Sequence, residues 1–108
     1  MNTKQYIFSE TTYHKWTLIK PIGSTAFFED FLNWVSGEFD LLLQEDANGL
    51  QVYFPNGSFN IKKVIHIDNS TNLEINVYSK VIRIGESYFN KISSLHQHFT
   101  NLYRASSF

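Results

Sequence analysis

Short turn signals divide the middle of the chain into segments of alternating polarity, and this pattern constrains the fold more than any other feature. Asn48-Gly49 is a strong hairpin signal because both residues tolerate a positive φ. A second turn is predicted at 55–57, which contains proline and glycine, and a third at 68–72. Strands joined by such short turns must be antiparallel, because a parallel neighbour would need a long crossover.

The stretches between these turns alternate apolar and polar residues with the period of a β-strand. Two earlier stretches are rich in aromatic and β-branched residues and also predict strands. The predicted strands are 4–8, 13–20, 38–46, 50–54, 59–67 and 73–84. The alternation of the last segment changes phase near Ser79, which indicates a β-bulge or two separate strands. We therefore expect an antiparallel sheet of five to six strands.

Two segments have the period of an amphipathic helix. In 24–37 the apolar residues occupy one half of a helical wheel. Ser24 or Thr25 can cap the start of this helix, and Gly37 suits its end. The segment 86–104 has apolar residues three or four positions apart. The predicted order is β-β-α-β-β-β-β-α, and the sequence favours an α+β fold with both helices packed on one face of the sheet.

Length and composition exclude several classes of protein. A chain of 108 residues suits a single domain, 1–108, and the lack of cysteine excludes a disulfide framework and a thiolate zinc site. The net charge is −1 and the basic residues are scattered, so the basic stripe typical of nucleic-acid binding is missing. No apolar run suits a signal peptide or a membrane span. These features favour a cytoplasmic protein.

The sequence LHQHF, at 95–99, contains the histidine pair most suggestive of a metal site or a proton-transfer site. Residues two apart on a helix point about 200° away from each other, so His96 and His98 cannot share a metal ion. A zinc-binding pair on a helix needs a spacing of three or four residues. We therefore interpret His96 as lying at the boundary of the apolar stripe and His98 as a surface residue.

His14 and His66 lie in predicted strands and would come together only if those strands were neighbours. Asp68 lies on the same side as His66 and could orient its ring. A general base needs a nucleophile or substrate within hydrogen-bond reach, and the sequence indicates neither. Surface positions are therefore favoured for both histidines. We predict no catalytic, cofactor-binding or metal-binding residue, and an enzyme is the less favoured class.

The sheet face turned away from the helices is the main candidate for a functional surface. The apolar residues of 59–67 that we expect under the helices are Phe59, Ile61, Ile65 and Ile67. Alternation then places other strand residues on the opposite face, although the phase change near Ser79 leaves the side of one of them open. Aromatic residues are enriched in protein interfaces, and this composition indicates a partner-binding surface. The predicted partner-binding residues are Tyr53, Lys62, Val64, His66 and Tyr78.

Two functions from different classes remain open. The favoured one is a small protein-interaction domain, such as an inhibitor, immunity or anti-defence protein, which binds another protein or a second copy of itself as a homodimer. The alternative is a small-molecule-binding domain or small enzyme with a pocket between sheet and helices. Lys63 points to this pocket, because it shares the apolar face and a buried lysine is costly unless it is paired or used. It could equally extend to solvent at the end of the sheet. Neither function requires a cofactor.

Overall fold

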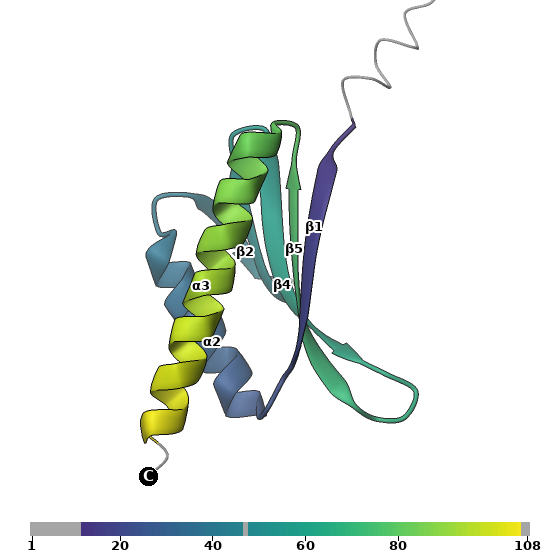
Figure 1. Cartoon of the computed structure of the whole chain (residues 1–108), viewed down its shortest axis with the longest axis vertical. Coiled ribbons are helices and arrows are strands. Elements are labelled where there is room, and N and C mark those ends of the chain that lie inside the picture. The colour runs from purple at the N-terminus through teal and green to yellow at the C-terminus, as the bar shows by residue number, and fades with distance from the viewer. Residues whose placement is uncertain (1–11, 47, 107–108) are drawn as a thin grey trace, which may run out of the picture.

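The computed structural model describes residues 12–46 and 48–106. Its elements are β1 (His14–Pro21), α2 (Thr25–Glu38), β2 (Leu43–Asp46), β3 (Gly49–Phe54), β4 (Gly57–Ile65), β5 (Thr71–Ser79) and α3 (Ile82–Ser106). The five strands form one sheet in the order β1-β5-β4-β3-β2, and every neighbouring pair is antiparallel. Both helices lie on the same side of this sheet (Figure 1). The predicted α+β class, antiparallel sheet and one-sided helix layer are confirmed.

The start of the chain differs from the predicted order, because only β1 precedes the first helix in the described part. The predicted strand 4–8 lies outside the described residues. The predicted strand 13–20 corresponds to β1, which pairs along its whole length with β5. α2 separates β1 from β2 in the chain, and β1 and β2 form the two edges of the sheet.

Local capping explains where α2 begins, and side-chain packing explains where it ends. Ser24 has an extended backbone, and its hydroxyl accepts a hydrogen bond of 3.0 Å from the Phe27 N–H, as expected of an N-cap. Gly37 was predicted to end the helix, but it lies inside, and the helix runs on to Glu38. The next residue, Phe39, is buried with its ring 5.0 Å from that of Phe59. Burial of this ring accounts for the continuation of the helix past Gly37.

The phase change near Ser79 marks the end of a strand and not a bulge. The pairing of β5 with both neighbours runs unbroken as far as Ser79. Its hydroxyl then bonds the backbone of Val81 twice, accepting from the N–H at 3.1 Å and donating to the carbonyl at 2.8 Å. α3 follows at Ile82, so the apolar residues that seemed to continue the strand belong to the first turn of the helix. Within the described residues, no helix combines the length and apolar character needed to cross a membrane.

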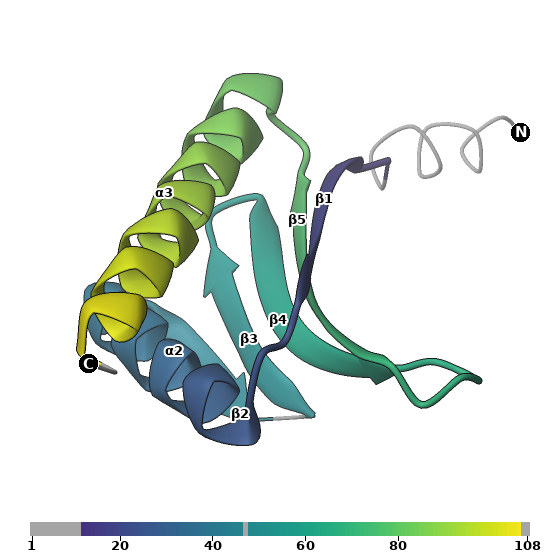
Figure 2. The same cartoon turned by 60° about the horizontal axis from the view of Figure 1, so that its bottom comes forward.

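The core lies between the sheet and the two helices. Its fully buried side chains are Phe31 and Val35 from α2, Ile92 from α3, and Val52, Phe59, Ile61, Leu73, Ile75 and Val77 from the sheet. The inward positions predicted for Phe59 and Ile61 are confirmed. Those predicted for Ile65 and Ile67 are wrong, since Ile65 is 67% exposed and Ile67 is fully exposed. The β4–β5 hairpin projects past the helices, so neither helix covers its apolar side there (Figure 2).

Each of the three predicted turns contains an asparagine with positive φ, namely Asn48, Asn56 and Asn69. Asparagine tolerates this conformation better than most residues, which explains its use at all three sites. Gly49 has φ +135°, and a Cβ there would collide with the carbonyl of Ile61 on the neighbouring strand. Glycine is therefore required at this position by both conformation and space.

Candidate functional site

The sheet face opposite the helices, called the reverse face below, carries four of the five predicted partner-binding residues on its strands. It is formed by the strand residues that alternate with the core residues. Tyr53 lies on β3, Lys62 and Val64 on β4, and Tyr78 on β5. The side of Tyr78 follows from its neighbours, because both adjacent residues of β5 are buried toward the helices. The reverse face therefore brings these four residues together.

One row of side chains crosses the reverse face from edge to edge. The strand register places Lys15, Tyr78, Ser58, Tyr53 and Leu43 opposite one another in that order, and we call them the tyrosine row. The Lys15 ammonium lies 5.4 Å from the centre of the Tyr78 ring, within the range of a cation–π contact. Tyr53 is 38% exposed and Leu43 68% exposed. The row thus crosses all five strands and carries aromatic or apolar groups on three of them, β5, β3 and β2.

A shallow hollow of about 360 Å³ lies beside the tyrosine row, lined by Tyr13, Tyr53, Gly57, Ser58 and Tyr78. Tyr13 is 46% exposed, and the Lys80 ammonium lies 5.6 Å from its ring centre. Gly57 has no side chain because a Cβ there would collide with the buried Phe54 ring and with the Tyr78 carbonyl. The hollow is large enough to admit one side chain of a partner.

Glu45, on the β2 edge, interacts with Tyr53, the most central exposed tyrosine. Its carboxylate accepts a hydrogen bond from the hydroxyl of Tyr53 and so raises the pKa of that phenol above its usual value of 10.0. Tyr53 is protonated at physiological pH, as an ordinary tyrosine is, and the bond to Glu45 favours that form further. It remains both a donor and an aromatic contact surface.

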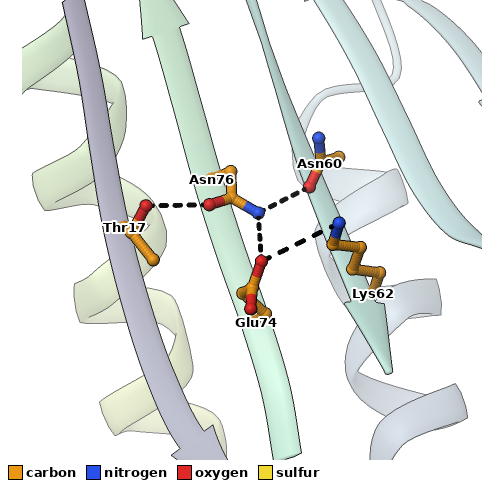
Figure 3. Close-up of polar contacts among 5 residues, drawn as sticks. All are labelled: Thr17, Asn60, Lys62, Glu74 and Asn76. Carbon is orange, nitrogen blue, oxygen red and sulfur yellow. Dashed lines mark hydrogen bonds and ion pairs between the residues drawn. The ribbon is translucent and has the colours of Figure 1, made fainter. Parts of the chain in front are cut away.

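A hydrogen-bond network centred on Asn76 joins three strands on the reverse face (Figure 3). The Asn76 carbonyl accepts a bond of 2.8 Å from the Thr17 hydroxyl on β1. Its amide group donates to Asn60 on β4 at 3.1 Å and to the Glu74 carboxylate at 2.9 Å. The Lys62 ammonium completes the network 3.8 Å from the same Glu74 oxygen. Asn76 is only 1% exposed, so both ends of a buried amide are satisfied.

Sequence reasoning missed Asn76 because an asparagine at an outward strand position normally faces solvent. The one available signal was the presence of polar residues at outward positions on three strands, Thr17, Asn60 and Asn76. Only the strand order places them side by side. The network fixes the side chains next to the tyrosine row and makes this part of the reverse face rigid.

The fifth predicted residue, His66, belongs to the turn between β4 and β5. Its Nε2 lies 2.8 Å from the side-chain nitrogen of Asn72, and its backbone N–H donates to the Ser70 carbonyl at 2.8 Å. Asp68 does not orient His66 but accepts bonds from the N–H and hydroxyl of Ser70 at 3.0 and 2.6 Å. These bonds lower the pKa of the Asp68 carboxyl. The polar groups here stabilise the turn.

His14 and His66 are not close to each other in the structure, although the sequence left open that they could be. His14 is paired with Ser79 at the end of β5, whereas His66 lies by the turn that precedes β5. The two histidines are therefore at opposite ends of that strand. Lys63, the suggested pocket residue, is exposed on the projecting hairpin. It therefore extends to solvent at the end of the sheet and does not line a pocket under the helices.

The two histidines of α3 occupy different surroundings. His98 is exposed, with its ring 5.6 Å from that of Trp34. His96 is only 8% exposed, more deeply buried than the boundary position predicted for it. Its ring meets Phe27 and Phe31 of α2 edge to face, at 6.0 and 5.3 Å. The reason is the close approach of α2, which covers this side of α3.

A cavity of about 520 Å³ lies next to His96, between the end of β1, the start of α2 and the last turns of α3. We call it the end cavity. It is lined by Lys20, Pro21, Ile22, Gly23, Ser24, Phe27, His96, Gln97, Thr100, Tyr103 and Arg104. The Nε2 of His96 and the Oγ1 of Thr100 are buried and have no hydrogen-bond partner. Burial of the ring, and then the charge of Lys20, lower the pKa of His96.

The lowered pKa of His96 predicts that the protein loses stability as the pH falls from 7.5 to 5.5. The unfolded chain takes up a proton on this ring near its ordinary pKa of about 6.5, whereas the folded protein does so only at lower pH. Acid therefore favours the unfolded state. The stabilisation that the folded protein gains from a neutral His96 is fully present above pH 7.5 and is lost as the pH falls. Urea unfolding across this pH range will show it.

His96→Leu removes the titrating ring and should flatten the pH dependence of the unfolding free energy. His98→Gln is the matched control on the same helix and should keep the slope of the wild type. Equal slopes in the wild type and His96→Leu would contradict the assignment.

Comparison with protein families and with curated proteins gives no match for this chain. Within the described residues, no group of three His, Asp or Glu side chains is arranged to hold a metal ion. The function is therefore argued from the reverse face and the end cavity.

Proposed function

We propose that this protein acts by binding another protein through its reverse face, with the tyrosine row at the centre of the contact. The observation that carries the proposal is the row itself, in which Tyr53 and Leu43 are exposed on a face that neither helix covers. Tyrosine is enriched among residues that dominate binding energy, because it buries a large area and loses little conformational entropy.

The surroundings of the row suit a protein partner. Charges of both signs lie in and beside the row. Lys15 ends the row on β1, Glu45 lies in the neighbouring row, and the pair Lys62 and Glu74 lies in the row after that. A mixed polar rim around an aromatic centre is typical of protein interfaces, whereas nucleic acid would require a predominantly basic surface. The Asn76 network holds neighbouring strands in place, so the reverse face loses little conformational entropy when a partner binds.

The role we propose is occupation of a partner's surface, as an inhibitor, immunity or anti-defence protein does. A contact of standard size would bury about 800 Å² on this chain. A homodimer through the same face is the self-binding form of the proposal. We place this activity in the cytoplasm, where a chain without cysteine loses nothing in a reducing environment.

Site-specific photo-crosslinking tests the proposal in the cells that make the protein. A benzophenone amino acid in place of Tyr53 should give one covalent adduct of defined mass, whose partner is then identified by mass spectrometry. With that partner purified, Tyr53→Ala should weaken binding by about 30-fold, as expected for a central tyrosine. Its thermal midpoint should remain close to that of the wild type, because Tyr53 lies outside the core.

The matched control carries the crosslinker in place of Asn90, an exposed residue of α3 on the helix side. It should give no such adduct. An adduct of twice the mass of the chain would support the self-binding form. The proposal is overturned if Tyr53 gives no adduct, or if Asn90 gives the same adduct in equal yield.

A further inference from the structure

We propose that the end cavity binds a small organic monoanion, a carboxylate attached to an apolar body. The site lies on the helix side of the sheet, away from the reverse face, and does not depend on the proposed function. The sequence suggests a small-molecule pocket at Lys63, but Lys63 is exposed. The end cavity is the site at which we propose small-molecule binding instead.

The electrostatics of the end cavity favour a negative charge. Lys20 and Arg104 line it from β1 and α3, and its described lining residues include neither Asp nor Glu. The start of α2 also faces the cavity through Ser24 and Phe27, and the N-terminal end of a helix carries a partial positive charge. Lys20 is close enough to His96 to contribute to the lowering of its pKa. An anion would pair with the charge of Lys20 and face the positive end of α2.

Two buried polar atoms supply the hydrogen bonds that such an anion would need. Nε2 of His96 and Oγ1 of Thr100 are both without a partner, although buried polar atoms are nearly always paired. Residues four apart on a helix lie on the same face, so both belong to one wall of the cavity. Each can donate a proton to a carboxylate oxygen, and Lys20 can pair with its charge. One ammonium and two further donors suit a single carboxylate.

Apolar side chains complete the site and indicate the body of the ligand. Ile22 and Phe27 line the same cavity, together with the ring of Pro21. Its volume of about 520 Å³ lies within the range of small-molecule sites, roughly 300–1,000 Å³. An inorganic anion would leave these walls uncovered, whereas an aromatic or aliphatic carboxylate would cover them.

Binding should be linked to protonation of His96. The groups that act on its ring are Lys20 from β1 and the uncharged Phe27 and Phe31 from α2, and Arg104 lines the same cavity farther along α3. A bound carboxylate would oppose the effect of Lys20 and favour the imidazolium, so affinity should rise as the pH falls. We expect an increase of about threefold or more between pH 8 and pH 6.

Sodium benzoate is the probe, followed by NMR of backbone amides and histidine rings in the full chain. Benzoate should shift the signals of His96, Thr100 and Lys20, while its neutral isostere benzamide should bind about tenfold more weakly. Inorganic phosphate should bind more weakly than benzoate, because it makes no apolar contact. Lys20→Met should reduce benzoate affinity about tenfold and Thr100→Val about threefold, in line with the loss of a charged and a neutral hydrogen bond.

Lys15→Met, which removes the same charge from the reverse face, is the matched control and should leave benzoate affinity unchanged. His96→Gln should abolish the pH dependence. The proposal is overturned if benzamide binds as tightly as benzoate, or if benzoate shifts His98 and leaves His96 unaffected. The comparison of the two probes uses the unaltered protein, so it stands even where a variant fails to fold.

Discussion

Asn76→Asp should destabilise the protein by about 3 kcal/mol or more at pH 7, as expected when a buried hydrogen-bond donor becomes an unpaired charge. The new carboxylate can still accept from Thr17, but its second oxygen replaces a donor. It would face the Glu74 carboxylate at the position of the present 2.9 Å bond. Asn60 can rotate its amide to donate, whereas Glu74 cannot. Urea unfolding at pH 7 measures the loss.

Acid should partly rescue this variant. Two carboxylates in contact hold one pKa above its ordinary value, so the folded variant binds a proton that the unfolded chain does not. Its stability relative to the wild type should therefore recover as the pH falls from 7 to 5. The control is Asn101→Asp, at an exposed site on α3. The side-chain oxygen that accepts a hydrogen bond from Gln97 is kept in this variant. We expect its free energy of unfolding to stay within about 0.5 kcal/mol of the wild type. Equal stability of Asn76→Asp and wild type at pH 7 would refute the closed network.

The features that could be predicted from sequence are those decided by neighbouring residues. Asn48 and Gly49 form a turn because of their own backbone preferences, and Ser24 caps a helix through a bond to a residue three positions away. The side of Tyr53 followed from the alternation of its strand. These properties do not depend on which strands become neighbours, so local patterns were sufficient.

The predictions that were wrong depended on how far one element extends over another. The alternation of β4 continues to Ile65, and Ile67 keeps the same period, but the helices end before they can cover either side chain. Ile82 and Ile84 prolong the alternation of β5, although the chain there has already entered α3. A strand pattern records which residues share a face. It does not record whether anything packs on that face.

The candidate sites required tertiary structure to be found. Asn76 becomes a buried centre only because β5 lies between β1 and β4, a strand order that no local signal contains. The orphaned Nε2 of His96 exists because α2 covers that part of α3. The sequence indicated where the tyrosines lie, but neither the rigid network beside them nor the end cavity.

Phe31→Ala should destabilise the protein by about 3–5 kcal/mol, the usual cost of removing a fully buried phenylalanine. Phe31 is 0% exposed and lies between the two helices. Its ring contacts Phe27 on its own helix and His96 and Phe99 on α3, at 6.3, 5.3 and 5.7 Å. Its loss opens a cavity between α2 and α3, where Phe27 and Trp34 make the other ring contacts. Chemical denaturation at pH 7.5, where His96 is neutral in folded and unfolded chains, measures this effect alone.

Leu41→Ala is the matched control, because it removes an apolar side chain that is 96% exposed, and it should change stability by no more than about 0.5 kcal/mol. The variant also tests why the pKa of His96 is low. Removing Phe31 lets water reach the imidazole, so the pH dependence of the unfolding free energy between 7.5 and 5.5 should become shallower. If Phe31→Ala lowers stability but leaves that slope unchanged, burial by Phe31 does not control the protonation of His96.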